Sequence, residues 1–227
     1  GLPPQTFDFS YRDSTNKLVR ECDITPKDFY EKYVDIALSD YVSIINAPTE
    51  DKPYGETYTV EMLGNVVGSP DVKYLNVSRE RLKELAIAQL KTGETVWFGS
   101  DVGQFSNRET GILDLDNYNF EGGMDIHFKQ NKAGRLDYSE SLMTHAMVLT
   151  GVDIDKQGKP IKWKVENSWG NKVGNQGYFV ATDKWMDEYC YQIVVKKNFL
   201  IKKELSSLQK KPTVLAPWDP MGALAKK

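Results

Sequence analysis

Cysteine and histidine are scarce in this sequence of 227 residues, which contains two of each: Cys22, Cys190, His127 and His145. Two cysteines are too few for a disulfide framework, and this favours a reducing compartment such as the cytoplasm. No His-Glu-x-x-His or Cys-x-x-Cys pattern occurs, and His127 has no partner at metal-ligand spacing, so we expect no metal site. Glycine loops of the phosphate-binding or dinucleotide-binding type are also missing, so we expect no organic cofactor.

Long apolar runs and a strong excess of one charge are absent as well. No stretch approaches the ~20 apolar residues of a membrane-spanning helix. A net charge of −3 gives no general attraction to nucleic acid or anionic lipid. The sequence shows no signal peptide and begins Gly-Leu-Pro-Pro rather than with Met, which suggests a fragment or a processed product.

Residues 141–170 gather the side chains that can carry chemistry. His145 precedes an apolar, β-branched run at 146–154, and Asn167 follows a second run at 161–165. The segment between the runs is rich in turn residues, so the two runs are predicted to pair as an antiparallel hairpin. Such a hairpin brings a histidine at the start of one strand near an asparagine after the next.

A histidine and an asparagine together suit a cysteine nucleophile. The histidine lowers the pKa of the thiol and carries its proton to the leaving amine. The amide oxygen of Asn167 can accept the second ring N–H of His145 and so fix the tautomer. Trp169, in the same Asn-Ser-Trp-Gly motif, can cover that hydrogen bond. A structural histidine is the alternative, and the motif favours the catalytic role.

Capping residues and periodicity predict the surrounding elements. Thr25-Pro26 begins a helix that stops by Asp40, Ser78 caps a helix over 79–91, and Asp183 caps a short helix. Residues 1–23 are predicted to be extended or irregular, residues 103–124 loop-like, and the proline-bearing tail 211–227 an extended arm outside the core. Strands are predicted at 41–45, 58–62, 95–99, 178–182 and 191–196, and a helical turn or two at 202–208.

Several blocks of the sequence resemble a known family. The Thr-His-Ala and Glu-Asn-Ser-Trp-Gly motifs, with a downstream Gly-Tyr, are similar to the histidine–asparagine half of papain-like cysteine peptidases. Over nearly the whole chain, the sequence resembles bleomycin hydrolase and the bacterial aminopeptidase C. The blocks that carry this wider resemblance are 24–26, 58–61, 96–103, 140–147 and 216–225.

The resemblance implies an α+β, papain-like cysteine peptidase fold, mainly its β-barrel half with a helical insertion and an extended C-terminal arm. Residues 1–77 would form the helical insertion and connectors, 78–200 the β-barrel subdomain with the histidine and asparagine, and 201–227 the arm. The implied protein is a cytoplasmic, homohexameric thiol aminopeptidase that removes N-terminal residues from peptides without a cofactor. His145 would be general base and acid, Asn167 its orienting partner and Trp169 the shield.

The residues around the histidine line a substrate pocket in the resembling family. Met143, Thr144 and Ala146 are therefore candidate pocket residues, although Met143 could instead simply pack in the core. The family's C-terminal arm enters the active-site cleft, where its terminal carboxylate pairs with the amino terminus of the substrate. Ala225 holds the end of that arm here, and we expect Lys226 and Lys227 to be trimmed or kept out of the cleft; a disordered tail is the alternative.

The nucleophile of the family lies in a Gln-x-x-x-x-x-Cys-Trp type segment, which this sequence does not contain. Cys22 precedes His145 by slightly less than the roughly 130–150 residues typical of simple papain-like enzymes. Its acidic neighbours Glu21 and Asp23 disfavour a thiolate, however, and no aromatic residue follows. Cys190 lies in an apolar run and is predicted to be a buried strand residue. We therefore expect the nucleophile upstream of Gly1, and this chain alone to be inactive.

Two other functions remain open. The chain can be a catalytically inactive fragment that serves as a binding or assembly module. Less favoured is a nucleic-acid binder that uses the lysine doublets at 196–197, 202–203 and 210–211, which are otherwise a solvated face.

Overall fold

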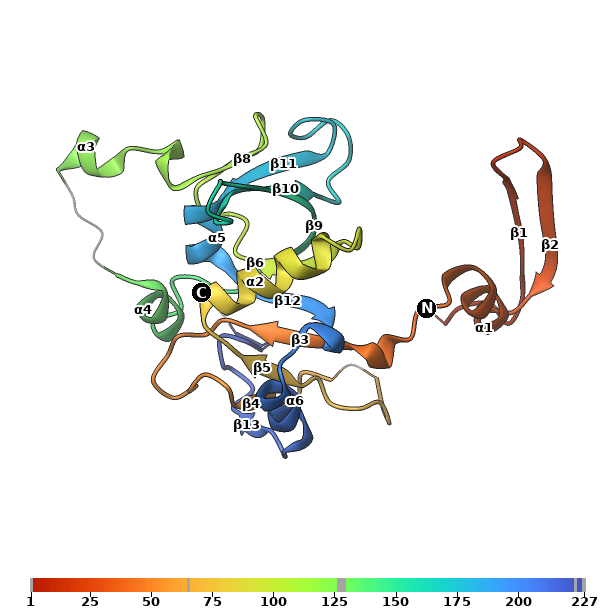
Figure 1. Ribbon diagram of the computed structural model, residues 1–227, viewed down its shortest axis with the longest axis horizontal. Helices are drawn as coiled ribbons and strands as arrows, with labels where there is room; N and C mark the ends of the chain where they lie inside the picture. The colour runs from red at the N-terminus through yellow and green to blue at the C-terminus, as the bar shows by residue number, and fades with distance from the viewer. Residues whose placement is uncertain (1, 65, 126–129, 223, 226–227) are drawn as a thin grey trace. The chain divides into compact units, whose positions relative to one another are not determined.

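The computed structural model describes residues 2–64, 66–125, 130–222 and 224–225 (Figure 1). The chain divides into two compact units, Gly1–Ser39 and Asp40–Lys227. In the ranges described, no helix combines the length and the apolar character needed to cross a membrane.

The first unit is an antiparallel hairpin followed by a helical turn. Strands β1 (Phe7–Arg12) and β2 (Leu18–Ile24) pair with each other, and α1 (Pro26–Phe29) runs on into a π-helical turn, Tyr30–Val34. The predicted cap is confirmed, because Thr25 Oγ1 accepts the Asp28 N–H at 3.1 Å. The hairpin itself was not predicted. Its alternating aromatic side chains pack on rings of the following turn, such as Phe9 on Phe29 at 4.9 Å, and that partner lies outside residues 1–23.

An 11-stranded sheet forms the centre of the second unit, in the order β13-β4-β5-β3-β12-β6-β9-β10-β11-β8-β7. Neighbouring strands are antiparallel except for the pairs β13/β4, β5/β3 and β11/β8. The strands are β3 (Tyr41–Ile45), β4 (Thr57–Val60), β5 (Tyr74–Asn76), β6 (Val96–Ser100), β7 (Ser106–Asn107), β8 (Ile112–Leu113), β9 (His145–Ile154), β10 (Pro160–Glu166), β11 (Tyr178–Thr182), β12 (Cys190–Lys196) and β13 (Thr213–Leu215). The predicted strands are confirmed to within a few residues at each end.

The helices of this unit are α2 (Arg79–Leu90), α3 (Phe120–Met124), α4 (Lys132–Asp137), α5 (Asp183–Tyr189) and α6 (Lys202–Gln209). Helix α2 begins after the predicted cap, because Ser78 Oγ accepts the Arg81 N–H at 3.2 Å. The cap predicted for α5 was wrong by one residue: the Thr182 hydroxyl accepts the first-turn N–H. The Asp183 carboxylate instead accepts hydrogen bonds from the Trp163 indole and from Lys83. Residues 103–124, predicted to be a loop, contain β7, β8 and short helical turns.

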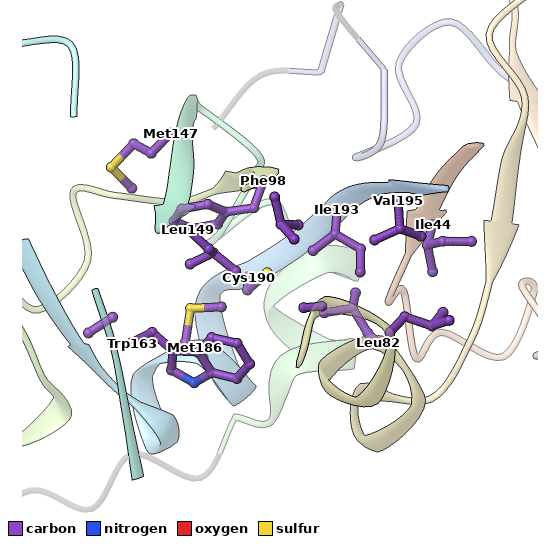
Figure 2. Close-up of a cluster of buried hydrophobic side chains, with 14 of the residues drawn as sticks. Ile44, Leu82, Phe98, Met147, Leu149, Trp163, Met186, Cys190, Ile193 and Val195 are labelled. Atoms are coloured by element: carbon purple, nitrogen blue, oxygen red, sulfur yellow. The ribbon is translucent and has the colours of Figure 1, made fainter. Parts of the chain in front are cut away.

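The core lies between the sheet, α2 and α5, and Figure 2 shows its labelled side chains converging. Ile44, Phe98, Leu149 and Ile193, from four different strands, are fully buried there. Cys190 begins β12 within this cluster, as predicted, and burial raises the pKa of its thiol to about 11. This cysteine is therefore a packing residue and stays a thiol at neutral pH.

Strands β3, β4 and β5 belong to the large sheet, so the boundary between the two compact units falls after Ser39 in the sequence. Ile44, Tyr58 and Leu75 from these strands are buried, which explains why the strands join the sheet. Our division at residue 77 stays a prediction about the domains of the longer protein.

The C-terminal arm is docked as far as Met221. Strand β13 pairs with β4, and Lys52 Nζ lies 2.8 Å from Asp219 Oδ2, with both side chains buried. Met221 is only 2% exposed and belongs to a second buried cluster. The arm is thus extended as predicted, but the expectation that it stays outside the core was wrong, because Asp219 and Met221 find buried partners in the 45–60 region.

Burial by itself would lower the pKa of Lys52, but hydrogen bonds and charge from Asp219 and Asp51 outweigh it and hold that pKa above its ordinary value. We expect Asp219→Asn to lower the free energy of unfolding by about 2–4 kcal/mol, because it leaves a buried lysine without its buried partner. Asp51→Asn is the matched control, since Asp51 contacts the same lysine but is 61% exposed, and should cost less than about 1 kcal/mol. An equal loss of unfolding free energy in the two variants, measured by urea denaturation, would contradict this account.

Lys132, at the start of α4, is a buried cation held by oxygen atoms. Its Nζ donates to Asn46 Oδ1 at 2.8 Å and to the carbonyls of Asp187 and Cys190 at 3.0 and 2.6 Å. The residue thereby ties the segment that leads to His145 onto β12 and α5. Burial lowers the pKa of Lys132 to about 8, because desolvation outweighs the nearby negative charges.

This pKa predicts a rise in stability with alkaline pH. Between about pH 8 and pH 10.5 the unfolded chain keeps the lysine proton that the folded chain has released, so the unfolded state binds more protons and stability increases with pH. Denaturant unfolding at pH 7.5 and 9.5 measures this effect. Between these two pH values, the free energy of unfolding should rise by up to about 2 kcal/mol more in wild type than in Lys132→Met. If the free energy of unfolding rises no more in wild type than in the variant, Lys132 does not titrate in this pH range.

Candidate active site

Three neighbouring strands place the candidate catalytic residues. His145 is the first residue of β9 and lies opposite Ser100, the last residue of β6. Strands β9 and β10 form the predicted hairpin, with Glu166 paired to Val148, so the chain leaves β10 beside the start of β9. The turn is held by Asp155, whose Oδ1 accepts the N–H groups of Gln157 and Lys159. Asn167 follows β10 directly and therefore lies next to His145.

The two side chains form the predicted hydrogen bond: His145 Nε2 lies 2.9 Å from Asn167 Oδ1. The same oxygen accepts the backbone N–H of Ser168 at 2.8 Å. That second donor fixes the amide orientation, because a flipped amide would set the Nδ2 hydrogens against the Ser168 N–H. An oxygen can only accept, so Nε2 carries the proton and Nδ1 is the basic nitrogen of the neutral ring.

Trp169 covers this pair. Its ring centroid is 5.0 Å from that of His145, and its indole meets Phe179 edge-on at 5.8 Å. Asn167 is 9% exposed, and its Nδ2 has no hydrogen-bond partner among the described residues. The structure thus brings His145, Asn167 and Trp169 together as predicted. The shielding strengthens the hydrogen bond, because a low local dielectric strengthens electrostatic contacts.

The three candidate pocket residues flank His145, where β6 ends and β9 begins. Thr144 donates its N–H to the Ser100 carbonyl at 3.0 Å, and Ala146 pairs with Gly99. Met143 lies over Gly99, where a Cβ would come within 2.3 Å of its sulfur. Met143 also packs against a buried cluster, so both of its predicted roles remain compatible with the structure. Their part in substrate binding stays a prediction.

A buried polar network beside the end of β6 and the start of β9 was not predicted. The Asp101 carboxylate accepts hydrogen bonds from Ser141 Oγ at 3.0 Å and Thr144 Oγ1 at 3.2 Å, and the Tyr191 hydroxyl donates to Ser141 Oγ at 2.6 Å. Asp101 is 1% exposed and Ser141 fully buried. The network fixes the chain immediately before His145. Only the position of Asp101 directly after an apolar strand hinted at it in the sequence.

The remaining candidates are the two cysteines, His127 and the residues at the C-terminal end. Cys190 lies in the core, and Cys22 is an exposed residue of β2 in the first unit. Ala225 donates its N–H to the Gly222 carbonyl, whereas His127, Lys226 and Lys227 lie outside the described residues. Within the described ranges, no three His, Cys, Asp or Glu side chains gather closely enough to hold a metal ion.

The large sheet with its helices has the fold of a papain-like cysteine peptidase, the class predicted from the sequence. The chain belongs to the Peptidase C1-like family, whose profile matches residues 1–222.

The chain is 67% identical over 227 residues to aminopeptidase C of Streptococcus thermophilus, covering all of this chain and 51% of that protein. It is 62% identical over 225 residues to aminopeptidase C of Lactococcus lactis subsp. cremoris, covering 99% of this chain and 51% of that protein. A crystal structure of PepW from Lactobacillus rhamnosis HN001 superposes with a TM-score of 0.95 at 58% identity, over 99% of this chain and 51% of the other. The chain therefore spans about half the length of the curated relatives it matches.

The hydrogen bond to Asn167 predicts which neutral tautomer the His145 ring adopts. Asn167→Ala removes the acceptor of the Nε2 proton, so the ratio of the two neutral tautomers should change by about fivefold, which corresponds to the ~1 kcal/mol of one hydrogen bond. The ¹⁵N chemical shifts of the His145 ring report that ratio. Ser168→Ala keeps its backbone N–H and is the matched control. An unchanged ratio in Asn167→Ala would show that Asn167 does not set the tautomer.

Proposed function

We propose that this chain supplies the histidine–asparagine half of a cysteine aminopeptidase, which removes N-terminal residues from peptides. The observation that carries the proposal is the His145–Asn167 hydrogen bond, whose oxygen is fixed by Ser168. It leaves Nδ1 of His145 as a base at the start of β9, beside the end of β6. The family and the aminopeptidase C relatives support this chemistry.

The proposed reaction uses His145 twice. First, Nδ1 takes the proton of a cysteine thiol, and the thiolate attacks the carbonyl carbon of the N-terminal residue. The imidazolium then gives that proton to the leaving nitrogen, so that the C–N bond breaks and a thioester with the cysteine remains. Next, Nδ1 takes a proton from water, whose oxygen attacks the acyl carbon, and the thiol leaves protonated. Asn167 accepts the Nε2–H throughout and keeps Nδ1 directed at the thiol.

We propose that the thiol comes from a segment of the longer protein outside this chain. Cys190 is buried, with the pKa of its thiol raised to about 11, and it packs in the core. Cys22 is an exposed residue of β2 in the first unit, and no aromatic residue follows it in the sequence as in the family's nucleophile segment. The oxyanion-binding Gln would come from the same outside segment as the nucleophile.

The arm and the pocket would set the specificity of the proposed enzyme. Met143, Thr144 and Ala146 would line the second specificity pocket, with modest discrimination of on the order of 1–3 kcal/mol per methylene. The arm, anchored through Asp219, would present a carboxylate at Ala225 to the substrate ammonium once Lys226 and Lys227 are removed. We further propose that the longer protein is a cytoplasmic hexamer.

Activity on an aminoacyl fluorogenic substrate tests the proposal in the longer protein. His145→Ala should reduce kcat by about 10³-fold or more, because it removes the proton carrier. Asn167→Ala should reduce kcat less, by about 10–100-fold, since the base remains but is no longer oriented. Cys22→Ala should change nothing. Full activity in His145→Ala would refute the assignment.

The 227-residue chain alone should show no turnover of the same substrate. A catalytically inactive fragment that serves in binding or assembly is the alternative for this chain by itself. Turnover by the chain that persists when Cys22 and Cys190 are both replaced by alanine would contradict a thiol supplied from outside.

A further inference from the structure

Trp169 belongs to a second feature besides the histidine pair. Its indole lines a groove of about 460 Å³, whose other lining residues are Arg108, Glu109, Lys172 and Val173. The groove therefore adjoins the indole that packs on His145. The reaction proposed above uses none of its charged side chains.

Two loops build the groove, and close backbone contacts hold them together. The Gly174 N–H donates to the Arg108 carbonyl at 2.9 Å, and the Val180 N–H donates to the Gly111 carbonyl at 2.7 Å. A Cβ on Gly111 would come within 2.9 Å of Gly174 Cα, so the two backbones touch at a point that only glycine fits. The loops that carry Arg108 and Lys172 are therefore fixed relative to Trp169.

The groove carries two cations and one carboxylate. The Arg108 guanidinium carbon lies 4.6 Å from the centroid of the Trp169 ring, a cation–π contact that orients the side chain. Arg108 and Lys172 are exposed, and within the described ranges neither makes an ion pair. Glu109 reduces the positive charge without cancelling it. The groove is thus suited to a small anion, particularly a planar carboxylate that a guanidinium can bind with two hydrogen bonds.

The groove lies within peptide reach of the candidate base. The Trp169 ring lies 4.6 Å from the Arg108 guanidinium and 5.0 Å from the His145 ring. The guanidinium is therefore at most about 10 Å from the His145 ring. An extended peptide advances roughly 3.3–3.6 Å per residue, so this span corresponds to about three residues. A substrate carboxylate at Arg108 would therefore belong to one of the first few residues beyond the bond being cut.

We propose that the groove binds a carboxylate on the leaving part of the substrate, so that the site favours short peptides with a free carboxyl end. This inference rests on the proposed aminopeptidase function. An aminopeptidase substrate carries an ammonium on its N-terminal side, which Arg108 and Lys172 repel, and a carboxylate at its other end, which they attract. An acidic side chain near the cut bond offers the same chemistry as the terminal carboxylate.

Three matched tripeptides test this in the longer protein: trialanine, trialanine amide, and Ala-Glu-Ala amide. We expect trialanine to exceed its amide about fivefold in kcat/KM, since each exposed charge pair contributes modestly. Lys172→Ala and Arg108→Met should reduce this ratio to below twofold, because they lower kcat/KM for trialanine more than for its amide. Glu109→Gln should increase the ratio. Lys156→Ala, an exposed lysine at the β9–β10 turn, is the control and should leave it unchanged.

The third peptide separates the two sources of the carboxylate. Ala-Glu-Ala amide cleaved as well as trialanine means that the groove accepts an acidic side chain; cleavage at the level of trialanine amide restricts it to the terminal carboxylate. Both results support the proposal. Equal kcat/KM for trialanine and its amide in wild type would overturn the proposal. So would an equal loss of kcat/KM for both peptides in Lys172→Ala and Arg108→Met.

A binding measurement distinguishes failure of the groove from failure of the proposed function. Dialanine and dialanine amide are titrated into the longer protein while the NMR signal of the Trp169 indole N–H is followed. A shift with dialanine only, reduced in Lys172→Ala, supports the groove even if no peptide is hydrolysed. No shift with dialanine overturns the groove assignment, whether or not the protein is an active aminopeptidase.

Discussion

A single amide oxygen organises the candidate site. Asn167 Oδ1 accepts one hydrogen bond from the His145 ring and one from the Ser168 backbone, so the orientation of the amide and the tautomer of the histidine are set together. Both side chains depend on the β9–β10 register, since a slip of one residue would move every side chain of a strand to the other face. Trp169 closes the pair on one side, and the glycine contacts behind the groove fix the loop that carries it.

Buried polar groups hold the segment that leads into this pair. Lys132 ties α4 to β12 and α5 through three oxygen acceptors, and Asp101 collects the hydroxyls of Ser141 and Thr144. Such groups are costly to bury unless they are hydrogen-bonded, and their directional bonds permit only one placement of the chain before His145. The apolar core beneath, with Phe98 and Leu149, supplies stability without that directionality.

The predictions succeeded where the signal is local. The β9–β10 hairpin, helix α2 with its Ser78 cap and the burial of Cys190 follow from runs of neighbouring residues, and the Asn-Ser-Trp-Gly motif placed Asn167 beside His145. They failed where the partner is distant in the sequence. The β1–β2 hairpin depends on rings of the next turn. Met221 joins a buried cluster that includes Ile45 and Val60, more than 150 positions earlier, and Asp101 finds its hydroxyls some forty residues later. Alternation and capping carry no information about such contacts.

The parallel pairing of β13 with β4 has a consequence for biosynthesis. All four residues of β4 are buried, and they are reached by a strand that is translated some 150 residues later. Until the ribosome has released residues 213–215, β4 is an unprotected sheet edge, which invites intermolecular strand addition. A chain that is truncated or clipped before this point would keep its histidine–asparagine pair but expose an aggregation-prone border. Strand β13 thus protects the backbone edge of β4 from pairing with another chain.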